Sequence, residues 1–167
     1  MLLSAGIIGT FGLIGIILQD KGFIYVKPSI QQLVLASIIF GSLAAGYNIW
    51  KTMFAKVFEL PERIWTIFAM RWGAYFVVMA LANEFIWRYF APGLEQPLSV
   101  LGVQLAPAGT YEFLGIEFGS RDMEDVWATW WKLATWFITK AFVLANTPLM
   151  LKHLVEEDAA PEEDATS

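Results

Sequence analysis

Cysteine is absent from the 167 residues, and histidine occurs once, as His153. Without cysteine there are no disulfide bonds, no thiol nucleophiles and no cysteine-ligated iron–sulfur clusters. A single histidine does not build a metal site by itself. The sequence also lacks a Ser/His/Asp set, paired carboxylates, a phosphate-binding loop and metal-ligand spacing. We therefore predict that the protein is not an enzyme, with no catalytic residues, no metal and no cofactor.

Charge is also scarce, at 16% of residues, whereas 57% are hydrophobic and the mean hydropathy is +0.53. Six of the sixteen acids lie in the last twelve residues, which leaves ten acids against eleven bases in the rest of the chain. Such a balance provides no basic surface for a nucleic acid. The composition is too apolar for an ordinary soluble domain of this length and favours a membrane protein.

The apolar residues are gathered in four blocks, at 2–18, 30–50, 64–87 and 126–151. A helix crosses the bilayer with ~20 mostly apolar residues, so each block is a candidate span, the first being marginally short. We predict an all-α fold, a polytopic transmembrane bundle of four helices over residues 1–155. Pro28 is expected at or near the first turn of the second span. The acidic tail, 156–167, is expected to be disordered.

Glycines recur at three-residue spacing in the first block, at Gly6, Gly9, Gly12 and Gly15. Small residues allow transmembrane helices to approach each other closely. These four glycines are therefore predicted to be helix-packing residues. Packing inside the bundle and self-association through a dedicated seam both fit the spacing.

The segment 91–125 is the one sizeable stretch between spans, and it contains six acids. Its partial alternation of apolar residues fits either a small β-hairpin lying on the membrane or an ordered loop. Basic residues are denser in the short connection 51–63, and a long acidic loop is easier to translocate. We therefore expect both termini on the cytoplasmic side.

Four ionisable residues fall inside the predicted spans, and such residues usually face protein or water. Glu84 near the end of the third span and Lys132 near the start of the fourth are expected at similar depth, which predicts an ion pair. Arg88 follows Glu84 by four residues and is placed to compete for the carboxylate. Asn83 is placed to join this cluster, which is either a clasp between two helices or a site for a headgroup, a partner helix or a proton.

Lys140 lies near the middle of the fourth span, where an unpaired lysine costs about 2.5–3.5 kcal/mol on insertion scales. Either backbone carbonyls and hydroxyls such as that of Thr139 receive it, or an acid on another chain does. In the second case Lys140 is a partner-facing charge. The tryptophans at 127, 130 and 131, with Trp87, form either an aromatic belt at the bilayer surface or a pigment or quinone site.

Five short patterns occur in an order that resembles the bacterial intracellular septation protein A family of inner-membrane proteins, over most of the chain except the tail. They are Phe23-Ile24 to Lys27-Pro28-Ser29, Leu60 to Trp65, Arg71-Trp72 with Asn83 to Arg88, Trp127 to Trp131-Lys132, and Asn146-Thr147-Pro148 with Lys152-His153. Against the family pattern, the chain is expected to be short at its amino terminus. Its 91–125 segment is longer, and Lys140 replaces an uncharged position.

The resemblance implies a multi-pass protein of the bacterial inner membrane that acts in cell division, septation and envelope maintenance. It implies action through protein contacts and brings no known catalytic activity. Membrane lipids, other integral membrane proteins or further copies of the chain are the expected partners. The glycine faces, aromatic residues and Lys140 also fit an alternative, an accessory transmembrane subunit of a larger respiratory or photosynthetic complex.

Overall fold

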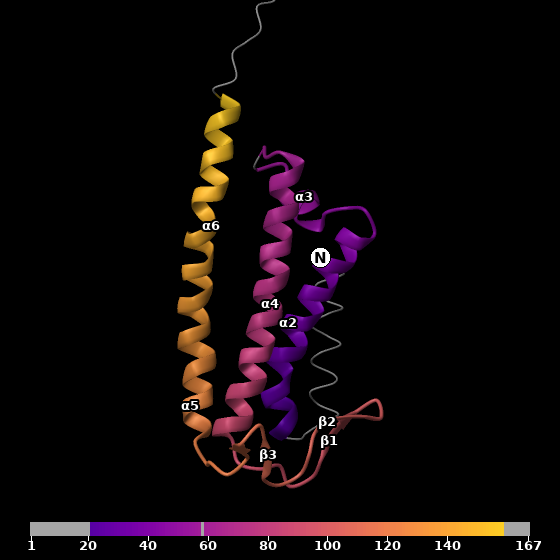
Figure 1. Ribbon diagram of the computed structural model, residues 1–167, viewed down its shortest axis with the longest axis vertical. Helices are drawn as coiled ribbons and strands as arrows, with labels where there is room; N and C mark the ends of the chain where they lie inside the picture. Colours follow the sequence, from indigo (N-terminus) through magenta and orange to yellow (C-terminus); the bar gives the residue numbers. More distant parts are fainter. Residues whose placement is uncertain (1–20, 58, 159–167) are drawn as a thin grey trace, which may run out of the picture. The chain divides into compact units, whose positions relative to one another are not determined.

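The computed structural model describes residues 21–57 and 59–158, with side chains up to Lys152. Most of these residues are helical (Figure 1). The helices in chain order are α2 (Lys21–Ala44), α3 (Ile49–Phe54), α4 (Glu62–Phe90), α5 (Glu124–Thr129), the π-helical η1 (Trp130–Ala134) and α6 (Thr135–Asp158). The described chain divides into two compact units. One holds the residues up to Gln32 with Met79–Lys132, and the other holds Leu33–Val78 with the residues from Leu133 onward.

Two β-hairpins lie between α4 and α5, so the prediction of an all-α fold is wrong in this segment. In the first, β1 (Leu98–Val100) pairs antiparallel with β2 (Val103–Ala106). In the second, β3 (Tyr111–Phe113) pairs with β4 (Ile116–Phe118). Of the two structures that the sequence left open for 91–125, the hairpin is therefore confirmed, and it occurs twice. The alternation of apolar residues fits this outcome because side chains of a strand point alternately to its two faces.

The helices α2 and α4 are the two in the described part of the chain that are long and apolar enough to cross a membrane. Only 39% and 44% of their most apolar windows are buried. Such low burial is unlike that of a helix at the centre of a soluble protein, where most of the apolar surface is covered. The other two predicted spans stay predictions, since 2–18 lies outside the described residues and α6 does not pass the same test.

The first unit, with the hairpins, has a continuous apolar core. Its buried residues come from the start of α2, the end of α4 and the residue after it, both strands of the first hairpin, and α5: Tyr25, Val26, Trp87, Ala91, Leu98, Ala106 and Trp127. This core ties the hairpin segment to the helices. Residues 91–125 are therefore an ordered part of the fold and not a free loop.

The second unit is held by aromatic contacts and a few polar ties. Trp72 of α4 stacks on Trp50 of α3, with ring centroids 5.2 Å apart, and meets the ring edge of Phe142 of α6 at 5.0 Å. Arg71 donates to the Asn146 side chain at 3.1 Å. Ring contacts and a side-chain hydrogen bond therefore hold α4 and α6 together directly, without bridging water.

Two boundaries differ from the sequence prediction. Pro28 lies inside α2 instead of at its first turn, because α2 is helical from Lys21, the first described residue. A proline removes one backbone donor, and membrane helices tolerate this loss better than soluble ones. The last helix continues through Pro148 to Asp158, so three acids of the predicted tail are helical. The rest of the tail lies outside the described residues, as do Gly6, Gly9, Gly12 and Gly15.

Candidate functional site

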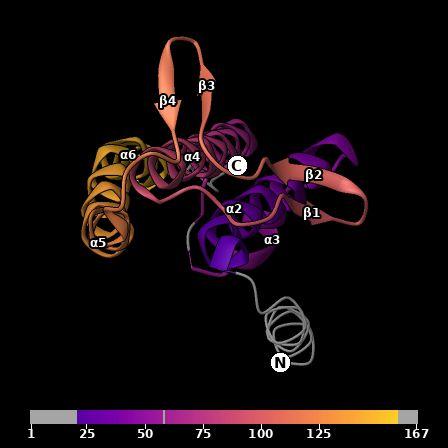
Figure 2. The same ribbon diagram turned by 90° about the horizontal axis from the view of Figure 1, so that it is seen from below.

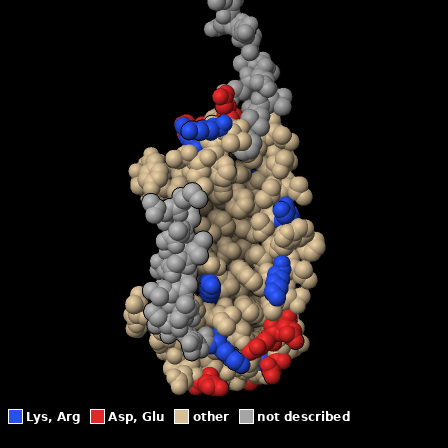
Figure 3. All heavy atoms as spheres, turned by 180° about the vertical axis from the view of Figure 1, so that it is seen from behind, with Lys and Arg blue, Asp and Glu red and all other residues tan. Residues whose placement is uncertain are grey.

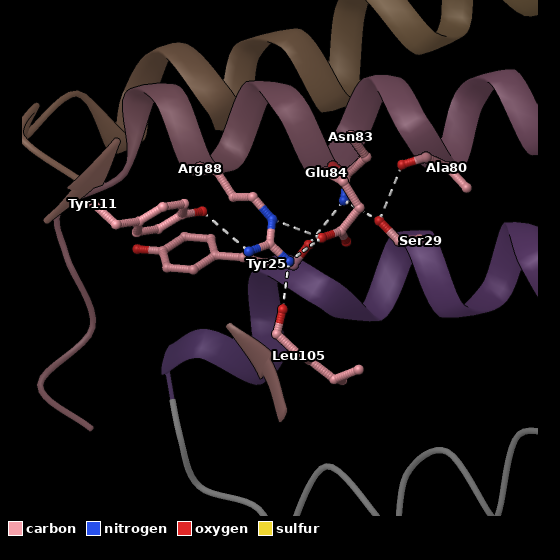
Figure 4. Close-up of polar contacts among 8 residues, drawn as sticks. All are labelled: Tyr25, Ser29, Ala80, Asn83, Glu84, Arg88, Leu105 and Tyr111. Carbon is pink, nitrogen blue, oxygen red and sulfur yellow. Dashed lines mark hydrogen bonds and ion pairs between the residues drawn. The ribbon is translucent and has the colours of Figure 1, made fainter. Parts of the chain in front are cut away.

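Asn83 is the centre of a buried polar network in the first unit (Figure 4). Its side chain is 0% exposed. Its amide nitrogen donates to the backbone carbonyl of Tyr25 and to the hydroxyl of Ser29, both at 2.9 Å. Its amide oxygen accepts from the indole nitrogen of Trp127 at 3.0 Å. Asn83 on α4 thus joins α2 to α5 and satisfies its hydrogen-bonding groups inside the protein.

The ring of Tyr25 reinforces the same junction. It stacks on Trp87 of α4, with centroids 5.5 Å apart, and meets Trp127 of α5 edge-on at 5.0 Å. Its hydroxyl donates to the carboxylate of Glu124 at the start of α5. Aromatic pairs in these geometries contribute about 0.5–1.5 kcal/mol each beyond their buried area. Trp87 and Trp127 are 3% and 9% exposed and belong to the core of this unit.

Arg88 is the second centre of the cluster, one helical turn beyond Glu84. Its guanidinium binds the Glu84 carboxylate through Nε at 3.0 Å and Nη2 at 2.7 Å. Nη2 also donates to the carbonyl of Leu105 in β2 at 2.7 Å, and Nη1 donates to the hydroxyl of Tyr111 in β3 at 3.1 Å. Figure 4 shows the guanidinium between these three partners. Arg88 therefore ties the end of α4 to both hairpins.

Backbone hydrogen bonds complete this attachment at the end of α4. The last carbonyls of a helix have no partner within it. Here Gly119 donates to the carbonyl of Arg88 at 3.0 Å, and Met123 donates to that of Phe90 at 2.9 Å. Gly93 in turn donates to the carbonyl of Gly119 at 2.7 Å. The segment after the second hairpin thus caps α4 and fixes both hairpins to it.

The structure brings three of the four predicted cluster residues together, namely Asn83, Glu84 and Arg88. The fourth, Lys132, is exposed in η1, and among the described residues the Glu84 carboxylate pairs with Arg88 instead. Arg88 prevails because residues four apart on one helix are already neighbours, whereas pairing with Lys132 requires a particular rotation of a second helix. Lys132 itself lies in the π-helical segment, which departs from the regular α-helical period that the prediction assumes.

Lys140, the predicted partner-facing charge, is exposed on α6, with its amino group 5.7 Å from the centre of the Trp136 ring. Thr139 beside it shares a hydrogen bond of 2.6 Å with the hydroxyl of Tyr75. The ion pairs of the described residues are Arg88–Glu84 and Lys51–Glu62, and neither includes Lys140. Its amine thus makes a cation–π contact with a ring on its own helix.

Sequence reasoning missed most of the partners of Asn83 and Arg88. Ser29, Tyr25 and Tyr111 lie far from them in the chain and carry no spacing signal that pairs them. From the sequence, Trp127 is expected at the membrane surface or in a pigment or quinone site, and not as a hydrogen-bond donor to Asn83. A usable signal was the presence of Asn83 inside an apolar run, since a buried amide requires donors and acceptors from other elements.

The polar groups of the cluster bond mainly to one another within the described residues. In the described residues, no three His, Cys, Asp or Glu side chains gather in a way that holds a metal ion. The Arg88 guanidinium donates through all three of its nitrogens within the chain. Both side-chain polar atoms of Asn83 also have partners within the chain. One carboxylate oxygen of Glu84 is buried without a hydrogen-bond partner. The cluster therefore has one acceptor that an external donor group would satisfy.

Comparison with known proteins gives a consistent result. The profile of the family described as intracellular septation protein A matches residues 1–94. Similar curated proteins include the inner membrane-spanning protein YciB of Rhizobium meliloti (strain 1021), 29% identical over 95% of this chain and 60% of the relative. The protein of the same name from Mesorhizobium japonicum is 26% identical over 98% of this chain and 59% of the relative. That from Nitrobacter hamburgensis is 39% identical over 53% and 45%.

The chain thus spans about 60% of the length of the first of these relatives. No solved structure matches it.

Proposed function

Because this chain belongs to the intracellular septation protein A family, we propose that it acts in cell division and envelope maintenance as a multi-pass inner-membrane protein. The observation that carries the proposal is the family match over residues 1–94, together with relatives named as inner membrane-spanning proteins. The role in septation is taken from the family description. The apolar α2 and α4, with more than half of their most apolar windows unburied, support the membrane location.

We further propose that the chain crosses the membrane four times, with both termini cytoplasmic. Two of the four crossings are α2 and α4. The other two are the apolar run at 2–18 and the fourth predicted span, 126–151, most of which is α6. With four crossings the hairpin segment faces the periplasm. The six acids of the hairpin segment then lie on the periplasmic side. The two lysines and the arginine of the 51–63 connection lie on the cytoplasmic side, in agreement with the bias of basic residues toward the cytoplasm.

The protein is proposed to work through contacts and not through catalysis. Support comes from the cluster around Asn83 and Arg88, which ties helices and hairpins together and leaves few groups free for chemistry. A rigid junction of this kind positions surfaces for partners. The partners proposed are membrane lipids and either other integral membrane proteins or a second copy of the chain.

The face of α6 around Lys140 is proposed to meet a membrane partner. Large apolar side chains on this helix are exposed, with Trp136 at 56%, Phe137 at 62% and Leu144 at 70%. A charged amine among them is costly in lipid unless it reaches water or an acidic or polar group. A photoreactive residue at Lys140 should therefore crosslink to a protein in cell membranes. The same residue at Leu81 of α4, which is 63% exposed, serves as the control and should react mainly with lipid.

The cellular proposal is tested by removing the gene in its own host and restoring it on a plasmid. We expect altered cell length or septum placement and raised envelope permeability without the gene, and recovery with the intact chain. Normal division and an intact envelope under osmotic stress would overturn the proposal. The alternative of a respiratory or photosynthetic accessory subunit finds no support in the comparisons, and we do not propose it.

A further inference from the structure

Both hairpins turn on the same pair of residues, a leucine followed by a glycine. In the first, Leu101 and Gly102 have φ of +52° and +79°. In the second, Leu114 and Gly115 have φ of +51° and +75°. Tight hairpins require such left-handed conformations in their turns, and asparagine or glycine usually supplies them. A leucine in this conformation is strained, because its Cβ approaches the following carbonyl oxygen, so the fold by itself disfavours leucine at both turns.

The two leucines recover little of that cost inside the described chain. Leu101 is 99% exposed and Leu114 is 84% exposed. Neighbouring apolar side chains are exposed as well, with Val103 at 61% and Phe113 at 63%. Each hairpin thus ends in an apolar tip whose side chains are mostly exposed. We define the hairpin tips as Leu101 with Val103 and Leu114 with Phe113.

The second hairpin has two chemically distinct faces. Its cross-strand pairs are Tyr111 with Phe118, Glu112 with Glu117, and Phe113 with Ile116. Because side chains alternate between faces, the two glutamates share one face and the four apolar or aromatic side chains share the other. Two like charges directly opposite each other are unfavourable unless water screens them. The glutamate face is therefore suited to water and the other face to an apolar medium.

The apolar face of this hairpin continues onto the exposed side of α4. Phe118 lies edge-on to Phe85 at 5.7 Å and to Tyr89 at 6.3 Å, and it stacks on Tyr111 at 5.5 Å. Phe85 itself is 47% exposed on α4. Ring contacts therefore lead from an exposed face of α4 to Tyr111, and Phe113 lies on the same face of the hairpin, nearer the turn.

The first hairpin is uncharged, and no charged residue occurs from Gln96 to Tyr111. Figure 2 shows both hairpins running outward across the axis of α4 instead of extending it. Acidic side chains gather around the end of the unit that carries the hairpins, in the lower part of Figure 3. The hairpin segment and the start of α5 contain six acids, at Glu95, Glu112, Glu117, Asp122, Glu124 and Asp125.

We propose that both hairpin tips insert into the bilayer, at the boundary between headgroups and acyl chains, beside the end of α4. The glutamate face of the second hairpin then points to water. The structure favours lipid as the medium around the tips. The apolar face of the second hairpin continues the lipid-facing surface of α4, and the two glutamates of the hairpin lie on the opposite face. The proposal rests on the membrane crossing by α4 proposed above.

The absence of cysteine allows single-cysteine labelling of the full chain reconstituted in phosphatidylcholine nanodiscs. An environment-sensitive fluorophore is attached at Phe113→Cys or Val103→Cys, with Glu112→Cys as the matched control on the opposite face. Quenching by lipids brominated near the glycerol end of the chain is compared with quenching by aqueous iodide. We expect blue-shifted emission and a higher lipid-to-iodide quenching ratio at 113 and 103 than at 112.

A label at Leu81→Cys separates the two proposals. One outcome is that lipid quenches the label at Leu81→Cys, while iodide quenches the labels at 113 and 103 as strongly as the label at 112. The tips then lie in water, so their insertion is refuted and the membrane crossing by α4 still stands. If neither quencher reaches 113 and 103, a second copy or another protein covers the tips, which also overturns the inference. If Leu81→Cys is not quenched by lipid, the crossing of α4 fails and the inference falls with it.

A second variant tests the leucines directly. Leu101→Asn with Leu114→Asn keeps both turns, since asparagine accepts the left-handed conformation well. In this double variant the label at 113 should lose part of its lipid quenching and shift to the red. Unchanged quenching at 113 and 103 would show that the leucines do not hold the hairpins in the bilayer.

Discussion

Asn83 is an amide in an apolar helix, and each of its side-chain hydrogen-bonding atoms has a partner in α2 or α5. Removing it leaves a buried indole N–H, a carbonyl and a hydroxyl without that partner. A buried group left unsatisfied costs about 1–3 kcal/mol. Asn83 is therefore important because it gives hydrogen-bond partners to the buried groups of Tyr25, Ser29 and Trp127.

Asn83→Ala is expected to lower the free energy of unfolding in detergent by about 1–3 kcal/mol or more. Ser29→Ala is the graded control, because Ser29 takes only one of the amide protons and donates a longer bond, 3.3 Å, to the Ala80 carbonyl. Thermal unfolding followed by circular dichroism measures both. A Ser29→Ala loss as large as that of Asn83→Ala would contradict the central position of the amide.

Glu84 offers a test between its two predicted partners. A double-mutant cycle of Glu84→Gln with Arg88→Met should give a coupling energy of about 0.5–3 kcal/mol, because either single change strands the other charge. The same cycle with Lys132→Met is the control and should be close to additive, since Lys132 is exposed. Strong coupling between Glu84 and Lys132 in detergent-solubilised protein would instead support the pair expected from the sequence.

At the scale of the elements, the attachment of the hairpins to the end of α4 depends on a close approach between the backbones of Gly93 and Gly109. A Cβ placed on Gly93 would lie 2.7 Å from the carbonyl carbon of Gly109. Backbone atoms held by hydrogen bonds do not yield at that distance, and Gly109 is itself bonded to the carbonyl of Leu94 at 2.9 Å. The glycine is therefore required here by lack of space.

Gly93→Ala should loosen both hairpins and destabilise the protein by about 1–3 kcal/mol, the usual cost of overpacking. Hydrogen exchange of the hairpin amides in detergent should become faster. Gly41→Ala in α2 is the matched control, because no atom lies within 4 Å of its added Cβ. That change should be neutral or stabilise by up to about 1 kcal/mol through helix propensity. Equal protection of the hairpins in the two variants would show that the glycine contact does not hold them.

For the whole molecule, the number of crossings decides on which side the hairpins lie. Glu112→Cys in the second hairpin should react with a membrane-impermeant maleimide in intact spheroplasts, because the proposed topology exposes it to the periplasm. Glu59→Cys, in the connection before α4, should react only after permeabilisation. The reverse pattern would invert the topology, and reaction of both residues in intact spheroplasts would exclude a crossing by α4.

The sequence predicts some elements and contacts of this protein and leaves others undetermined. The third span, predicted over 64–87, is α4 over Glu62–Phe90, because a long apolar run leaves few alternatives to a helix. The cluster of Asn83, Glu84 and Arg88 was predictable from its position inside that run. Its partners Tyr25, Tyr111 and Leu105 were not, since contacts between distant segments depend on packing that no local pattern encodes.

The sequence by itself determined that the protein is apolar, mostly helical and related to an inner-membrane family, because these properties follow from composition, run length and ordered motifs. Only the tertiary structure decided that Arg88 binds Glu84 and both hairpins, that Trp127 serves Asn83, and that two leucines stand exposed at the hairpin turns. The reason is physical. Local periodicity fixes an element and its buried face, whereas the rotation of one element against another is set by side-chain packing and by the need to pair every buried polar group.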